Sequence, residues 1–186
     1  MRKNFGFKPL MYPMPVLIIA AYDEADVPNA MNAAWGCICD FDKVALILDK
    51  GHKTTKNILK RGAFTVSMAD AAHAVEADYL GIVSGNSTPD KLAKAGLHTK
   101  KSEFVDAPVI CELPMVIECQ LLSFDEEFEL LIGKIINVGA DESILGEDGL
   151  IDPVKLRPIT YDPAHNAYLT LGEKVGNAFR DGKTLK

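Results

Sequence analysis

The chain has 186 residues, of which 48% are hydrophobic and 25% are charged, and its formal net charge is −6. This length and composition fit one globular domain with a sizeable core and exclude a disordered chain. The acidic balance argues against a general nucleic-acid-binding protein, whose surface would be basic over a broad face.

The apolar segments are too short for a membrane-spanning helix, which needs roughly 18–20 apolar residues. The best candidate, residues 15–21, has the composition of a buried strand. The N-terminal segment begins with a basic pair but has prolines where a signal peptide needs its apolar centre. We therefore expect a cytoplasmic protein without a membrane partner.

Short apolar or alternating runs bounded by turn residues predict strands in both halves of the chain. Helices are predicted where a capping residue precedes a helical pattern and a glycine follows it. In the first half of the chain the predicted elements are a strand at 16–21, a turn at 23–29, an apolar segment at 30–39, a hairpin-like turn at 40–43, a strand at 44–48, a helix capped by Thr54 or Thr55 that ends at Gly62, a strand at 63–68, a helix at 69–80 and a helix from Pro89 to Gly96. The second half is predicted to contain strands at 109–111, 115–124 and 128–138, a helical turn at 141–145, a loop with room for one more turn at 146–156, and strand-like pieces around Tyr161 and Tyr168.

The predicted strands, about six or seven with two or three helices between them, cluster rather than alternate with the helices. This pattern favours a mainly β, α+β, barrel-like fold over a doubly wound parallel sheet. We expect a single domain over residues 1–186, with a core at about 10–170 and a tail at 171–186.

The four cysteines do not have the spacing of a metal site. Cys37 and Cys39 form a C-x-C pair, and Cys111 and Cys119 are eight apart on another predicted strand, whereas metal sites usually combine matching C-x₂₋₄-C pairs. No metal site is predicted, and we expect all four to be reduced, buried, small apolar residues. A redox role for Cys37 and Cys39 is the less favoured alternative.

The segment KGHKTTKNILKR at residues 50–61 holds five of the chain's 20 Lys and Arg residues and no acid. A strand leads through Gly51 into the predicted helix, whose first turn would expose free backbone N–H groups and the positive end of the helix dipole. Hydroxyls of Thr54 and Thr55, with the charge of Lys53, would complete a phosphate site.

Lys50 and His52 are further candidates for this anion site. The alternative, with equal weight from spacing alone, is a solvated basic helix face, because Lys53, Lys56 and Lys60 share one side of the helix. The segment is not a Walker A loop, since no second glycine precedes Lys53, and the chain has no G-x-G-x-x-G motif.

The segment Asn29–Trp35 contains the chain's one tryptophan and two amide side chains. Buried amides must find hydrogen-bond partners, and the alanines between them leave the backbone accessible. A planar heteroaromatic ligand suits this composition, with amide and backbone groups on its polar edge and Met31 and Trp35 on its face or rim. The alternative is a core strand with a structural tryptophan, which this segment alone favours.

Three blocks together resemble the flavin reductase-like FMN-binding proteins, in particular their flavoredoxin-like branch. They are NAMNAAWGCICDFDKVALIL at 29–48, KGHKTTKNILKRGAFTVSM at 50–68 and ADYLGIVSGNSTPDKLAKAGL at 77–97. The resemblance covers roughly residues 10–170. It implies a split β-barrel with a few peripheral helices and FMN bound at the interface of a homodimer.

By this resemblance, Asn29–Trp35 would line the isoalloxazine and ribityl groups, and the first turns of the helix after Gly51 would hold the 5′-phosphate. The residues implied to bind the cofactor are Asn29, Ala30, Met31, Asn32, Ala33, Ala34, Trp35, Leu48, Lys50, His52, Lys53, Thr54, Thr55 and Asn57. The family often has threonine at the position of Asn32, so flavin reactivity or orientation is expected to differ here.

Two further residues have open roles. Lys91 would approach the ligand or the dimer contact, or lie exposed on a helix, and His165 would close over the flavin or nicotinamide, or belong to a loop. No catalytic acid or base is evident, as expected where the cofactor carries the hydride chemistry.

The resemblance implies an NAD(P)H-dependent flavin reductase-type oxidoreductase. One alternative is a flavoredoxin-like FMN electron carrier reduced by a protein partner. Another is a binding module that uses the same barrel for a different phosphorylated or tetrapyrrole ligand.

Overall fold

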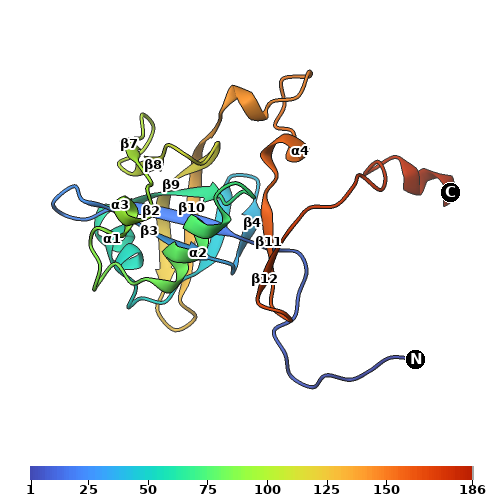
Figure 1. The fold of residues 1–186 in the computed structure, drawn as a ribbon, viewed down its shortest axis with the longest axis horizontal. Helices are drawn as coiled ribbons and strands as arrows, with labels where there is room; N and C mark the ends of the chain where they lie inside the picture. The colour runs from blue at the N-terminus through green and yellow to red at the C-terminus, as the bar shows by residue number, and fades with distance from the viewer. Residues whose placement is uncertain (186) are drawn as a thin grey trace.

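A seven-stranded antiparallel sheet forms the body of the protein in the computed structural model, which describes residues 1–185 (Figure 1). Its strand order is β3-β2-β6-β9-β10-β5-β4. The strands are β2 (Leu17–Tyr22), β3 (Pro28–Ala33), β4 (Gly36–Asp40), β5 (Lys43–Ile47), β6 (Ala63–Met68), β9 (Met115–Asp125) and β10 (Leu130–Ala140). The prediction of a mainly β, α+β fold without a parallel sheet is confirmed.

The sheet curls into a barrel because its two outermost strands are neighbours in the sequence. β3 and β4 lie at opposite ends of the strand order, yet only Ala34 and Trp35 connect them. A side chain on Gly36 would come within 2.7 Å of Leu17 in β2 and 2.6 Å of Leu46 in β5. The two ends of the sheet therefore meet at Gly36 without pairing, which is the split β-barrel that the resemblance implies.

The main hydrophobic core fills the inside of this barrel. Ile19, Phe64 and Leu131 are fully buried there, and Ile58 of helix α1 (Lys53–Arg61) packs into the same cluster. A second cluster covers the outer face of β2 and β3, where helix α2 (Ala74–Ile82) contributes Leu80. β2 is therefore buried on both faces, which explains its continuous apolar sequence.

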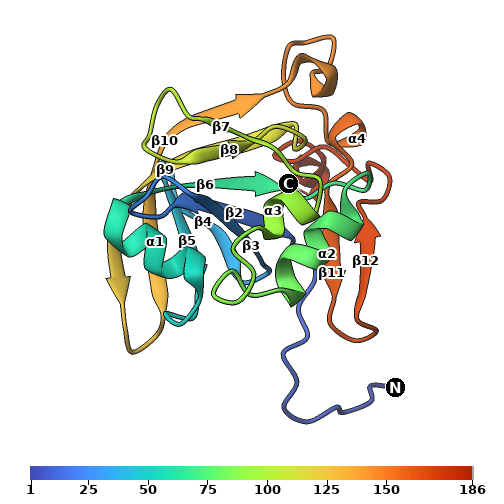
Figure 2. The ribbon, with the colours of Figure 1, turned by 60° about the vertical axis from the view of Figure 1, so that its left-hand side comes forward.

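Shorter elements surround the barrel. They are helices α3 (Lys91–Lys94) and α4 (Pro153–Leu156), the 3₁₀ turns η1 (Glu142–Ile144) and η2 (Asp181–Leu185), the pair β7 (Thr99–Lys101) and β8 (Pro108–Ile110), and a small sheet of β1 (Met14–Pro15), β11 (Ile159–Asp162) and β12 (Ala167–Thr170). Figure 2 shows the β11–β12 hairpin beside α2 at one end of the barrel. Among residues 1–185, no helix is both long enough and apolar enough to cross a membrane.

Helix α1 begins before its predicted cap. The N-cap residue is His52, not Thr54 or Thr55. The chain turns at Gly51, whose N–H donates to the Asp49 side chain at 2.6 Å, so the helix starts at once. Both threonines consequently lie in its first turn and are buried.

Other boundaries shift for similar local reasons. The carboxylate of Asp70 accepts the N–H groups of Ala72 and His73, each at 2.9 Å. This turn delays the helix predicted at 69–80 until Ala74, and the helix predicted from Pro89 to Gly96 is limited to Lys91–Lys94. The predicted end of α1 at Gly62 is confirmed.

The prediction of four buried cysteines is wrong for three of them. Cys37 and Cys39 on β4, and Cys111 after β8, are exposed free thiols. Only Cys119 is buried, and burial, followed by the charge of Glu118, raises the pKa of its thiol to about 12. β4 is an edge strand that the described part of the chain leaves uncovered, which a sequence pattern does not distinguish from a covered strand.

Lys91 is buried, so the alternative of an exposed helix lysine is wrong. Its side chain is 2% exposed and its ammonium donates to the carbonyls of Leu80 at 3.1 Å and Val83 at 2.9 Å. These carbonyls end helix α2, where a cation interacts favourably with the helix dipole. Lys91 thereby ties the loop at residues 83–90 to the end of α2. Burial lowers the pKa of Lys91 to about 8.

This pKa predicts a pH-dependent stability. Between pH 8 and the ordinary lysine pKa of 10.5, the unfolded chain binds more protons at Lys91 than the folded protein does, so the free energy of unfolding rises with pH there. The penalty of burying the charge is present below pH 8 and is relieved toward pH 10.5. Urea unfolding at several pH values should therefore show the stability of the wild type relative to Lys91→Met rising across this window, by up to about 3 kcal/mol. A difference that stays flat or falls would contradict this assignment.

Candidate functional site

Two cavities open along β3, one at each end of the strand. Within residues 1–185, β3 pairs only with β2, so its other edge carries no hydrogen-bonded strand. We call the cavity at the start of β3 the lysine cavity and the cavity at its end the tyrosine cavity. The strand rises about 3.3 Å per residue, so the two cavities lie roughly 13 Å apart along it.

The lysine cavity has a volume of about 250 Å³ and lies between the β2–β3 turn, the start of α1 and the loop after α2. Its lining residues are Asp23, Val27, Pro28, Asn29, Lys53, Gly85, Asn86 and Pro89. The structure thus brings together two residues predicted to bind the cofactor, Asn29 and Lys53. Gly85 and Asn86 were not among the predicted site residues, although the loop that contains them belongs to the third block of the resemblance.

Asn29 is the buried polar residue at the centre of this cavity. It is 4% exposed, and its amide nitrogen donates to the hydroxyl of Thr54 at 2.6 Å. Its amide oxygen and the hydroxyl of Thr55 are buried without a partner among the described residues. A side chain on Gly85 would come within 2.1 Å of the Asn29 amide oxygen. Glycine at position 85 therefore leaves room for Asn29, which retains unused hydrogen-bonding capacity.

The first turn of α1 also has unused donors. No side chain caps it and it contains no acid. In residues 1–185, no acceptor is assigned to the backbone N–H groups of Lys53, Thr54 and Thr55. A helix N-terminus with free N–H groups and positive dipole potential binds anions.

Most of the basic segment is already neutralised by acids of the same chain. Lys53 pairs with Asp23 at 3.1 Å, and Lys60 pairs with Glu24 at 2.7 Å. Although burial opposes it, hydrogen bonds from Val27 and Lys53 hold the pKa of Asp23 below its ordinary value. The cations therefore cluster partly because this face of α1 lies against the acidic β2–β3 turn. The groups of this segment that remain available to bind an anion lie at the start of α1.

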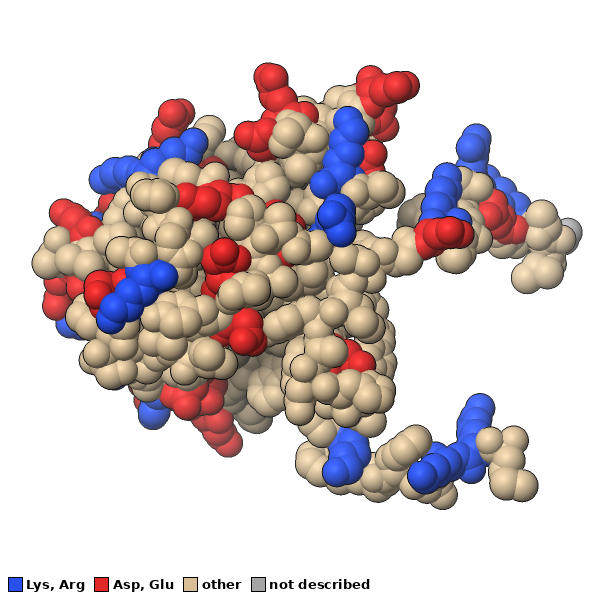
Figure 3. Space-filling view, in the orientation of Figure 1, with Lys and Arg blue, Asp and Glu red and all other residues tan. Residues whose placement is uncertain are grey.

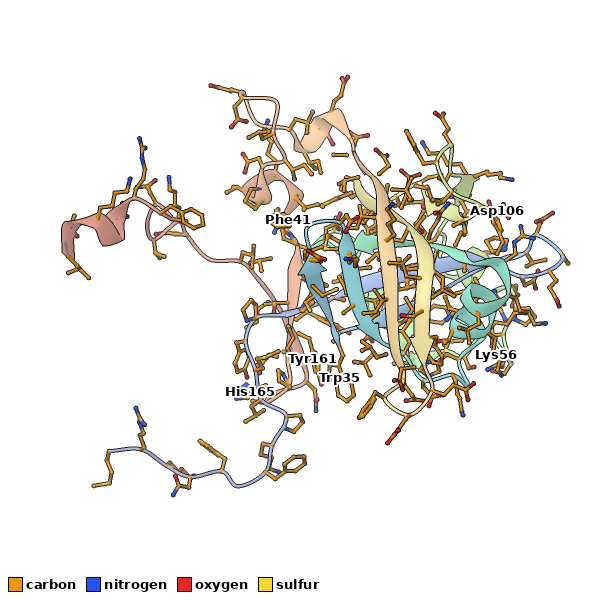
Figure 4. All side chains as sticks on the ribbon, turned by 180° about the vertical axis from the view of Figure 1, so that it is seen from behind. Trp35, Phe41, Lys56, Asp106, Tyr161 and His165 are labelled. Atoms are coloured by element: carbon orange, nitrogen blue, oxygen red, sulfur yellow. The ribbon has the colours of Figure 1, made fainter. Side chains whose placement is uncertain are left out.

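The remaining cations of this segment lie away from the lysine cavity. Lys50 pairs with Glu126 at 3.2 Å, and Arg61 bridges Asp26 at 2.6 Å and Asp106 at 3.0 Å. Lys56 is exposed on the outer side of α1 (Figure 4).

The tyrosine cavity has a volume of about 380 Å³ and lies between the end of β3, helix α2 and the β11–β12 hairpin. Its lining residues are Val16, Asn32, Ala33, Ala34, Asp78, Gly81, Ile82, Tyr161, Asn166 and Tyr168. The predicted residues Asn32, Ala33 and Ala34 are thus joined by aromatic residues more than 120 positions later in the chain. The two tyrosines beside His165 were the one sequence signal for them.

Hydrogen bonds hold the polar walls of the tyrosine cavity. The Asn32 amide donates to the carbonyl of Ala77 at 3.0 Å, and the Tyr168 hydroxyl donates to Asp78 at 2.8 Å. Burial, followed by the hydrogen bond to Asp78, raises the pKa of Tyr168 to about 12. Tyr168 therefore stays protonated at neutral pH, and its hydrogen bond to Asp78 fixes the position of its ring in the cavity lining. Its ring centroid lies 6.1 Å from that of Tyr161.

Trp35 and His165 lie near this cavity without lining it. Trp35 follows the lining residue Ala34, its side chain is 58% exposed, and Figure 4 shows it on the same side of the molecule as Tyr161. His165 lies at the tip of the β11–β12 hairpin and pairs with Asp162 at 2.6 Å. Its side chain is mostly exposed, and the neighbouring Asn166, rather than His165, lines the cavity.

The other predicted residues occupy different surroundings. Ala30, Met31 and Leu48 belong to the hydrophobic clusters and line neither cavity. His52 is exposed at the helix cap, and the amide of Asn57 donates to the carbonyl of Ala21 at 3.4 Å. Their part in cofactor binding stays a prediction.

Comparisons with known proteins agree with this architecture. Flavoredoxin of Desulfovibrio vulgaris (Miyazaki F) is 40% identical, with a TM-score of 0.93 over 98% of this chain and 100% of that chain. An FMN-binding domain of a flavin reductase-like enzyme from Shewanella baltica shares the fold at 24% identity, with a TM-score of 0.79 over 88% of each chain.

An uncharacterized protein of Aeropyrum pernix is 26% identical over 172 residues, which is 87% of this chain. The chain spans 64% of the length of that relative. The model of the flavin reductase like domain matches residues 10–165. The chain therefore belongs to the flavin reductase-like domain family.

Proposed function

We propose that the protein binds FMN, with the phosphate in the lysine cavity and the isoalloxazine ring in the tyrosine cavity. The observation that carries this proposal is that residues from the two ends of one strand, β3, line the two cavities. One cavity offers anion donors and the other a partly aromatic slot. An elongated ligand with a phosphate at one end and a planar ring at the other suits this arrangement.

The residues of the lysine cavity fit a phosphate and the polyol beside it. The free N–H groups at the start of α1 would donate to phosphate oxygens. Lys53 would supply charge, sharing it with Asp23. The unpartnered amide oxygen of Asn29 is an acceptor, so it would receive a hydroxyl of the ribityl chain rather than contact the phosphate.

The residues of the tyrosine cavity fit a planar ring. Tyr161 and Tyr168 supply aromatic surface, and Asn32 and the backbone of Ala33 and Ala34 supply polar groups at the strand edge. Bound FMN would supply the acceptor for two electrons, which a nicotinamide delivers together as one hydride. The chain's own groups would then position the ring and exclude water.

We further propose that the protein is a homodimer that uses the exposed β4 edge. Trp35, Ile38 and Phe41 are 58%, 60% and 105% exposed, although apolar side chains of this size gain free energy when buried. Such a group of exposed side chains is typical of an interface. Because Trp35 adjoins the tyrosine cavity, a second copy on this edge would lie next to the flavin.

Two electron donors are compatible with this site. As an NAD(P)H-dependent flavin reductase, the protein would accept hydride from a nicotinamide laid against the ring. As an electron carrier, it would be reduced by a protein partner, and the 40% identity to a flavoredoxin favours this second function.

The fit of the lysine cavity predicts that Gly85→Ala weakens FMN binding. The new side chain would displace the Asn29 amide oxygen, and losing its proposed hydrogen bond from the ribityl chain costs about 1–2 kcal/mol of binding free energy. Titration of the apoprotein with FMN should show a Kd raised by roughly tenfold.

The matched control is Gly172→Ala, where an added side chain meets nothing within 4 Å. This variant should bind FMN like the wild type. If Gly85→Ala also binds like the wild type while remaining folded, the lysine cavity does not hold the cofactor.

The electron donor is tested with the visible spectrum of the FMN-loaded protein during anaerobic addition of NADH and then NADPH. Bleaching of the flavin within seconds would establish the reductase function. A spectrum that persists with both nucleotides, but bleaches with a low-potential reduced redox protein, would rule out direct nicotinamide oxidation and establish the carrier.

A further inference from the structure

The first eleven residues form an arm that leaves the body of the protein. All of them are exposed, and the described structure contains no hydrogen bond or ion pair from them to the body. The arm extends from the barrel in Figures 1 and 2. Fully extended, it would reach about 35 Å, which is comparable to the diameter of a small domain. We call residues 1–11 the N-terminal arm.

The base of this arm is held firmly. The hydroxyl of Tyr12 donates to Asp162 at 2.5 Å, and the N–H of Met14 donates to the hydroxyl of Thr160 at 2.9 Å. β1 pairs with β11 immediately after the arm. The arm therefore starts from the hairpin that lines the tyrosine cavity, and it points away from its own barrel.

The composition of the arm is opposite to that of the body. The arm carries Arg2, Lys3 and Lys8 and no acid, which gives it a formal charge of +3. Because the whole chain has a net charge of −6, residues 12–186 carry a net charge of −9. Figure 3 shows the cations along the arm and several groups of acids on the visible face of the body. Opposite charges of this size attract and orient two surfaces.

The arm also carries exposed aromatic groups. Phe5 and Phe7 are 63% and 99% exposed, and Lys3 lies 5.5 Å from the ring centroid of Phe5. Burying two phenylalanine side chains stabilises an assembly by about 1.5–3 kcal/mol each. The arm thus has both a charge and an apolar reason to dock on an acidic, partly apolar surface.

We propose that the N-terminal arm docks on the body of the second copy in the homodimer. This inference rests on the proposed dimer and adds the segment that each copy contributes to the other. The partner's body has the complementary negative charge, and the β4 edge supplies exposed apolar side chains. Since the arm leaves beside the tyrosine cavity, its exchange places a segment of each chain near a flavin site.

The test uses the wild-type protein in two preparations, one with natural ¹⁴N and one uniformly labelled with ¹⁵N. The two preparations are mixed until native mass spectrometry shows dimers that contain one copy of each. A carbodiimide then cross-links lysines to carboxylates in direct contact. We expect cross-linked peptides that pair Lys3 or Lys8 of one isotope with an acid at positions 14–170 of the other isotope. In a sample with hybrid dimers, cross-links of the arm to same-isotope body peptides alone would overturn the proposal.

Analytical ultracentrifugation tests whether the dimer exists separately from whether the arm is exchanged. The triple variant Arg2→Gln, Lys3→Gln and Lys8→Gln should dissociate at a concentration at least tenfold higher than the wild type, with the difference shrinking in high salt. Lys94→Gln, which removes a cation on α3, should leave dissociation unchanged. A monomeric wild type would refute the proposed homodimer, whereas a dimer unaffected by the triple variant would refute only the arm exchange. Co-sedimentation of the wild type with anionic vesicles, without mixed-isotope cross-links, would assign the arm to a lipid surface instead.

Discussion

The two-residue connection between β3 and β4 is the constraint on which the rest of the structure depends. Ala34 and Trp35 join the opposite edges of a seven-stranded sheet, so the sheet must curl until these edges meet. Gly36 makes this approach possible because any side chain there would overlap Leu17 and Leu46. Closure without pairing leaves β3 with a free edge, and residues from the two ends of this strand line the two cavities of the candidate site.

The closed barrel also determines which helix lies beside each end of β3, and therefore which polar groups each cavity contains. Helix α1 starts next to the beginning of β3, so that Asn29 contacts Thr54. Helix α2 lies along the end of β3, where Asn32 contacts Ala77. Lys91 holds the loop between these two contacts by capping α2 from within the protein. The length of β3 therefore sets the distance between the anion donors at the start of α1 and the aromatic side chains of the tyrosine cavity.

Local patterns predicted what depends on local chemistry. The strands at 16–21 and 63–68 and the end of α1 at Gly62 follow from composition and glycine placement. The resemblance predicted the split barrel. Single-sequence patterns could not place Tyr168 against Asp78, because the two are separated by 90 residues in sequence and meet only through the tertiary fold. Burial of Lys91 and exposure of Cys37 and Cys39 were missed for the same reason, since burial depends on what packs against an element.

The proposed complex depends on the phosphate of FMN being held at the start of α1. It is tested most directly by comparing FMN with riboflavin, which lacks the phosphate, in titrations of the wild-type apoprotein. Fluorescence of the chain's one tryptophan, Trp35, provides the readout beside the tyrosine cavity. FMN should bind at least tenfold more tightly than riboflavin, a difference of about 1.4 kcal/mol, and added salt should reduce this preference. Equal affinity for the two flavins would contradict the proposed phosphate site.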